Sequence, residues 1–198
     1  VYKRQYIDIA NVRDKDWVIA DYARRKRKVH FGEVMALCHE KHSELMRPFH
    51  KKEYKGRVVF RGDIVKDESG FYAVFSEQGT SASHQAAAKF LDAVARLPGC
   101  DGEDSDAEGA YTQVVLTDEM FREMGEEPVD TWISIPYDRW PDSWKKRKDL
   151  HKPVVKLLRN LYGHPLAGLY WEKHCQKIIF NAGFETVSYT HLRAHETQ

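Results

Sequence analysis

The chain of 198 residues carries 31 lysines and arginines against 30 aspartates and glutamates, so its net charge does not indicate any class of partner. An apolar content of 42% is sufficient for a packed core and excludes a chain that is disordered by composition. The three cysteines are scattered without a CxxC pair, which argues against a disulfide framework and a zinc ribbon. Because no run of about 18 apolar residues occurs, we do not expect a membrane-spanning helix. We expect an intracellular protein.

Both ends of the chain resemble translated adapter DNA. The first five residues, "VYKRQ", can be encoded by GTG TAT AAG AGA CAG, and the reverse complement of that DNA encodes Val-Ser-Tyr-Thr. The final stretch, "VSYTHLRAHETQ", begins with the same four residues. We therefore expect residues 1–5 and 187–198 to be library sequence that lies outside the fold, and the chain to be a piece of a longer polyprotein.

Residues 6–50 are predicted to form a mostly helical, polar extension. Their apolar positions fall at loose helical spacing, at Tyr22, Val29, Val34, Leu37, Cys38 and Leu45. Five consecutive cations occupy residues 24–28. Such a run is typical of a solvated helix face, and a nucleic-acid contact is the alternative that the sequence leaves open.

Residues 51–186 change in character and mix strands with helices. β-favouring residues predict strands at 58–60 and 71–75, with a turn at 67–70 between them. A helix is predicted within "SASHQAAAKFLDAVARLPG", because Ala87, Phe90, Leu91, Val94 and Leu97 share one helical face. Ser81 or Ser83 can cap this helix, and Pro98 and Gly99 end it.

Further elements are predicted toward the end of the chain. We expect a short strand through Asp106, strands within "TWISIPYDRW" and "PVVKLL", and a helix within "GLYWEKHCQKIIFNAGF" that stops at Gly183. Because strands and helices do not alternate regularly, the sequence predicts an α+β fold rather than a doubly wound sheet.

Few chemical motifs are present. The stretch "CHEKH" puts His39 and His42 at i and i+3, one residue short of the H-E-x-x-H spacing that binds zinc from one helix face. Nucleophile-elbow, Walker and dinucleotide-binding motifs do not occur in the sequence. The strongest remaining candidate is "DSDAEGAYTQ", which combines carboxylates at Asp104, Asp106 and Glu108 with small residues and Tyr111.

Four segments in order resemble the reverse transcriptase of copia-type LTR retrotransposons. The family's "YKARLVARG", "MDVKTAFLNG", "VYMEQPPGF" and "KSLYGLKQAPRAWYEKL" correspond to "EYKGRVVFRG" at 53–62, "SDAEGAYTQ" at 105–113, "WISIPYDRW" at 132–140 and "RNLYGHPLAGLYWEKHCQKIIFNAGF" at 159–184. The interval from Leu161 to Trp171 matches the family in length. Residues 51–186 would then be the fingers and partial palm of a right-hand polymerase.

The sequence also departs from the family. The family's Gln-Ala-Pro is replaced by residues 166–168, "LAG", and the paired-aspartate turn "YVDD" does not occur. Two of the family's catalytic carboxylates are therefore expected outside this sequence, and the chain alone is expected to be inactive.

The resemblance implies a role for each matching residue. Asp106 would be the first catalytic carboxylate and would bind Mg²⁺ together with the backbone carbonyl of Ala107, since hard cations prefer oxygen ligands. Tyr111 would lie under the sugar of the incoming deoxynucleoside triphosphate and exclude a 2′-hydroxyl. Tyr162 and Gly163 would form a turn against the template and nucleotide. The implied partners are an RNA or DNA template with its primer, and deoxynucleoside triphosphates.

The cations of the first segment are also implied to bind the nucleotide. Lys55, Arg57 and Arg61 share one face if the segment is a strand, and the family uses this region against the triphosphate. An edge strand protected by charges is the alternative for these three residues. Core packing is the alternative for Tyr111, and a non-catalytic nucleic-acid-binding or assembly module from a decayed element is the alternative for the chain. A nuclease built on Asp104, Asp106 and Glu108 is a third interpretation.

Overall fold

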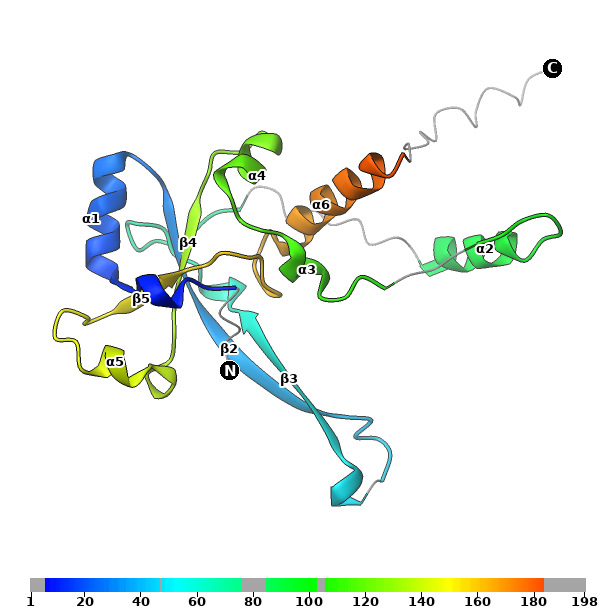
Figure 1. Ribbon diagram of the computed structural model, residues 1–198, viewed down its shortest axis with the longest axis horizontal. Helices are drawn as coiled ribbons and strands as arrows, with labels where there is room; N and C mark the ends of the chain where they lie inside the picture. The colour runs from blue at the N-terminus through cyan, green and yellow to red at the C-terminus, as the bar shows by residue number, and fades with distance from the viewer. Residues whose placement is uncertain (1–5, 47, 76–84, 103–105, 184–198) are drawn as a thin grey trace.

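The computed structural model describes residues 6–46, 48–75, 85–102 and 106–183. These residues form an α+β fold around one five-stranded mixed sheet of order β1-β5-β4-β2-β3. The strands are β1 (Arg13–Asp14), β2 (Val29–Lys41), β3 (Glu53–Phe60), β4 (Asp130–Ser134) and β5 (Pro153–Lys156). The β2–β4 pair is parallel, and the other neighbours are antiparallel (Figure 1).

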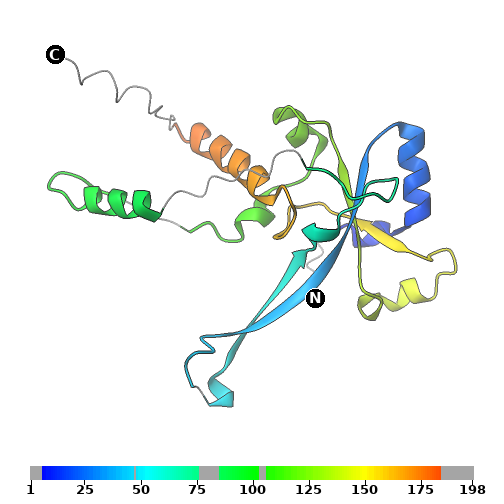
Figure 2. The ribbon, with the colours of Figure 1, turned by 180° about the vertical axis from the view of Figure 1, so that it is seen from behind.

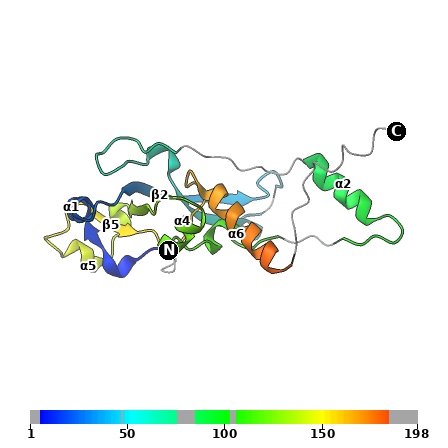
Figure 3. The same ribbon diagram turned by 90° about the horizontal axis from the view of Figure 1, so that it is seen from above.

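Helices flank the sheet and extend from it. The α-helices are α1 (Lys15–Arg25), α2 (Gln85–Ala95), α3 (Ala110–Gln113), α4 (Asp118–Glu123), α5 (Asp142–Lys145) and α6 (Ala167–Asn181). Short 3-10 turns are η1 (Ile9–Asn11), η2 (Phe49–Lys51), η3 (Gly62–Ile64) and η4 (Tyr137–Arg139). Figures 1 and 3 show α2 lying away from the sheet, while α1 lies beside the sheet. No helix in the described part of the chain is long and apolar enough to cross a bilayer.

The core forms because neighbouring strand residues point to opposite faces of the sheet. On one face Trp132 and Val154 pack with Val18 and Tyr22 of α1. On the other face Ile133 and Val155 pack in the larger cluster, which also holds Val34, Phe60, Val65, Trp144, Leu157 and Leu161. The two layers bury β4 and β5 on both faces.

The predicted helical extension is wrong over residues 29–41. A helix does form at Lys15–Arg25, where Asp14 caps it by accepting the N–H of Asp16. Residues 29–41, however, form β2, which lies between β4 and the edge strand β3. Pairing of residues 29–33 with β4 and of residues 34–41 with β3 overrides the loose helical spacing, and Val29 and Phe31 gain burial in the α1 layer.

The later elements agree better with the sequence. The helices α2 and α6 and the strands at 58–60, 130–134 and 153–156 form as predicted, and Gly183 follows α6 with a φ of 91°. The proposed caps of α2 at Ser81 and Ser83 lie outside the described residues. The strand predicted at 71–75 is reduced to a bridge between Lys66 and Tyr72, because the Asp67 carboxylate accepts the N–H groups of Ser69 and Phe71 and closes a tight turn.

Candidate functional site

The segment around Asp106 is a loop that leads into a short helix, so the strand predicted there is wrong. Gly109 adopts a left-handed conformation with a φ of 60°, which turns the chain before α3. The N–H of Thr112 donates to the carbonyl of Gly109 at 2.8 Å, and that of Ala110 donates to Ala107 at 3.2 Å. These local bonds occupy the groups that a strand would pair. Asp106 and Ala107 are exposed, and Asp104 lies outside the described residues.

Tyr111 stacks on Tyr162, a residue 51 positions later in the printed sequence. The ring centroids lie 4.6 Å apart with an interplanar angle of 39°. Tyr111 is half-buried and Tyr162 is 41% exposed, so the pair faces solvent on one side and neither ring belongs to the buried core. Arg159 fixes this contact by donating from Nη1 to the carbonyls of Thr112 and Gln113 at 3.2 and 3.1 Å.

Gly163 brings a third segment to the same point. The N–H of Phe60, at the end of β3, donates to the carbonyl of Tyr162 at 2.7 Å. Gly163 has a φ of 89°, and a Cβ there would collide with the backbone of Phe60. A Cβ on Gly62 would likewise collide with the carbonyl of Gly163. Both glycines are therefore required by a close approach of two backbones.

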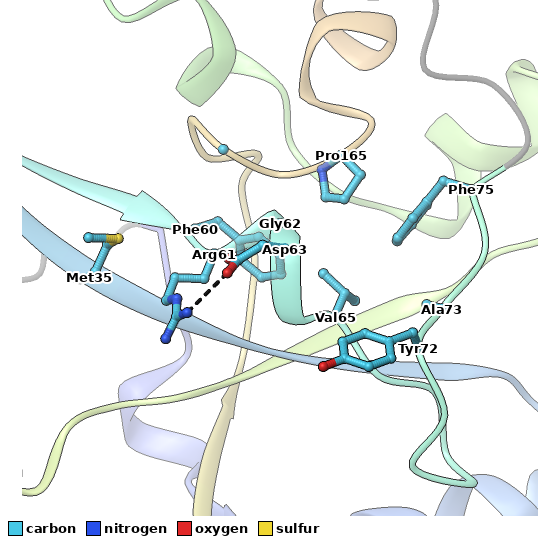
Figure 4. A pocket seen from close by; sticks show the side chains of 11 residues that line it. Met35, Phe60, Arg61, Gly62, Asp63, Val65, Tyr72, Ala73, Phe75 and Pro165 are labelled. Carbon is cyan, nitrogen blue, oxygen red and sulfur yellow. Dashed lines mark hydrogen bonds and ion pairs between the residues drawn. The ribbon is translucent and has the colours of Figure 1, made fainter.

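A pocket of about 520 Å³ opens beside this contact (Figure 4). Side chains of Phe75, Pro165, Tyr72 and Val65 line it, and an ion pair between Arg61 and Asp63 lies at its edge. Met35, Phe60, Ala73 and the two glycines complete the lining. Its volume is within the range of small-molecule sites, which run from about 300 to 1,000 Å³.

The three cations that were predicted to act together do not lie in one place. Lys55 and Arg57 are exposed on β3, whereas Arg61 follows the strand and donates to Asp63 at 3.0 Å. The hydrogen bond with Asp63 raises the pKa of Arg61, and Glu33 adds a smaller effect of the same sign. Strand geometry puts Lys55 about 16 Å from Phe60, and of the three cations only Arg61 lines the pocket.

Among the described residues, no group of three histidine, cysteine, aspartate or glutamate side chains could hold a metal ion. This includes His39, which lies in β2, and His42, which follows that strand. Four cations of the five-residue run form ion pairs within the fold: Arg24 and Arg25 pair with Asp21, Arg27 with Asp118, and Lys28 with Glu127. These ion pairs favour a structural role for the run over a nucleic-acid contact.

Three buried polar residues were not singled out by sequence reasoning. Asp130 accepts from the Tyr22 hydroxyl and pairs with Lys156 at 2.7 Å. Burial and the Asp130 hydrogen bond raise the pKa of Tyr22.

Burial lowers the pKa of His164 to about 3, so this residue is neutral, and its Nδ1 accepts the N–H of Leu166. Asn160 is fully buried and donates to the Ala167 carbonyl at 2.9 Å. A lone polar residue in an apolar run is the signal that marks such positions, but it does not identify their partners.

Comparisons of the chain with protein-family models, with curated proteins and with solved structures find no match. Function therefore has to be argued from the residues and from the geometry described above.

Proposed function

We propose that the chain carries the fingers and part of the palm of an RNA-directed DNA polymerase of the copia retrotransposon type. The complete polyprotein would copy an RNA or DNA template by adding deoxynucleotides to a primer. The observation that carries this proposal is the meeting of three segments that resemble the family: Tyr111 stacks on Tyr162, and Gly163 packs against Phe60. The segments lie far apart in the sequence, and a nucleotide site built from them requires that they lie together.

The tyrosine pair suits the binding of a nucleotide sugar. Tyr111 lies in α3, shortly after the exposed residues Asp106 and Ala107, and its ring contacts that of Tyr162 on one side. A ring fixed in this way fills a defined volume and excludes a ligand that needs an extra hydroxyl there. Arg61, at the edge of the adjacent pocket, offers the forked donor geometry that phosphate groups bind well.

Magnesium forms part of the proposal for the complete protein. Phosphoryl transfer with two metal ions requires several carboxylates, and Asp106 with the Ala107 carbonyl would supply only part of such a site. The described residues do not by themselves fit a two-magnesium centre, since they contain no suitable group of three ligands.

The same reasoning predicts that this 198-residue chain does not extend a primer. Losing one member of a cooperating catalytic set costs about as much as losing the whole set. Primer extension by the purified chain above a no-protein control would contradict the proposed division of the catalytic carboxylates.

Sugar selection tests the proposed function without requiring turnover. The chain is mixed with a template and a dideoxy-terminated primer, and the affinity of the complementary nucleotide is measured with a deoxyribose and with a ribose. We expect the deoxynucleotide to bind more tightly, and Tyr111→Ala to reduce the ratio of the two affinities by relieving the clash with the 2′-hydroxyl.

Tyr137→Ala is the matched control, because Tyr137 is an exposed tyrosine in η4 whose ring contacts Trp140 and Lys145 instead of Tyr162. This variant should leave the ratio unchanged. If Tyr111→Ala lowers both affinities equally, Tyr111 has a structural role and the proposed sugar contact is wrong.

A further inference from the structure

Beyond the part of β2 that pairs with β4, β2 and β3 continue as a two-stranded arm, which we define as residues 35–46 and 48–59. Figures 1 and 2 show the arm extending away from the remaining elements. Most of its residues beyond Val34 on β2 and before Val58 on β3 are exposed on both faces. An isolated hairpin is only marginally stable in water, so an arm of this length suggests that a partner covers it.

The tip of the arm is apolar and exposed. Leu45, Met46 and Phe49 are 48%, 106% and 82% exposed, and Pro48 lies next to Phe49. Apolar side chains of these types at the end of a protruding element are the kind that proteins insert between base steps of a duplex.

The outer part of the arm has an excess of basic residues. Residues 39–57 contain six lysines and arginines, three glutamates and three histidines, while the whole chain has a net charge of only +1. The glutamates are already engaged within the arm, where Glu40 pairs with Lys52 and Glu53 with Lys41, both at 3.0 Å. Lys51, Lys55 and Arg57 form no ion pair with any residue that the structure describes, so their charges remain available to an anionic partner.

The strand register gathers these charges on one face. Lys55 lies opposite His39, and Arg57 lies opposite Leu37 in the antiparallel β2–β3 ladder. Side chains at alternate positions of a strand share a face, so Lys55 and Arg57 project together about 7 Å apart. The cations therefore run along the stem as well as near the tip.

We propose that the arm binds double-stranded DNA, with the stem following the phosphate backbone along a groove and the apolar tip contacting a base step. Two-stranded ribbons bind DNA grooves in this manner. A membrane surface would meet the tip but would leave Lys55 and Arg57 unused. The proposal depends on neither Asp106 nor the tyrosine pair, so it stands apart from the polymerase proposal.

The stem is tested by fluorescence anisotropy of a fluorescein-labelled DNA duplex of about 24 base pairs, over a salt range of about 50 to 200 mM. Each phosphate contact contributes about 0.9 to the log–log salt slope. The double variant Lys55→Gln/Arg57→Gln should therefore reduce the slope by about 1.8. The control Lys146→Gln/Lys148→Gln removes two exposed cations elsewhere and should leave the slope unchanged.

The tip is tested with 2-aminopurine in the same duplex, because the fluorescence of this base rises when it unstacks. We expect the full chain to raise the signal and Met46→Ser/Phe49→Ser to abolish the rise, with circular dichroism verifying that the exposed substitutions leave the fold intact. Failure to bind the duplex at the lowest salt, or equal slopes for the stem and control variants, would overturn the proposal. Tip-dependent retention on phosphatidylserine vesicles without duplex binding would assign the arm to membranes instead.

Discussion

Gly163→Ala should destabilise the protein far more than the same substitution in an open turn. Gly163 and Gly70 have nearly the same φ, at 89° and 85°, so an alanine at either position has a backbone strain of about 1–2 kcal/mol. A Cβ on Gly163 also collides with the backbone of Phe60, whereas a Cβ on Gly70 meets nothing within 4 Å. Forcing a buried contact apart adds about 1–3 kcal/mol, so we expect a total loss of about 2–5 kcal/mol at Gly163.

Urea unfolding measures both losses, and the five tryptophans provide the fluorescence signal. Gly70→Ala reports the strain alone, and the difference between the variants reports the contact between the 161–165 turn and the end of β3. Equal free energies of unfolding for the two variants would refute the reasoning, because they would mean that the turn does not pack against Phe60.

Two further predictions concern buried polar residues. Asp130→Asn removes the charge that Lys156 contacts, and should lower the free energy of unfolding by about 2 kcal/mol, since Asp130 is buried while Lys156 keeps part of its contact with water; the exposed Asp142→Asn should change it little in the same urea assay. His164 has a folded-state pKa below its ordinary value of 6.5, so the unfolded chain binds more protons and stability is lost as the pH falls below 6.5. We expect the free energy of unfolding to fall by about 1 kcal/mol between pH 6.5 and 5.5. His164→Asn should show a shallower pH dependence of this free energy, and its amide oxygen can still accept the Leu166 N–H. The same pH dependence in the wild-type chain and the variant would contradict a buried, neutral His164.

The sequence predicted those elements whose own pattern determines them. The helix α6 has apolar residues at helical spacing and a glycine at its end, and β4 and β5 are short β-favouring runs that are buried on both faces. The pattern failed for β2, because its conformation depends on pairing with β3 and β4 rather than on its own spacing. The sequence pattern also failed near Asp106. Gly109 turns the chain there, and a glycine at this place has the same sequence pattern as the end of a strand.

The candidate site could be predicted only in part, for a similar reason. The resemblance singled out Tyr111, Tyr162 and Gly163 separately, but single-sequence spacing cannot reveal that one ring stacks on another or that Gly163 packs against Phe60. The pocket beside them is lined by residues from several segments, including the 72–75 loop, which carries no motif. The ion pair of Arg61 with Asp63 depends on η3, whereas the sequence predicted only a shared strand face.

Template-directed nucleotide selection is the most direct test of the central claim, that Tyr111, Tyr162 and Gly163 form the nucleotide site of a polymerase. The full chain is mixed with a labelled duplex, made of a dideoxy-terminated primer on templates that differ only in the next base. The amount of duplex that the chain retains is then measured with each of the four deoxynucleoside triphosphates. We predict that only the complementary nucleotide increases retention and that Gly163→Ala, if still folded at low temperature, weakens this increase. Equal retention with all four nucleotides on every template would contradict the claim.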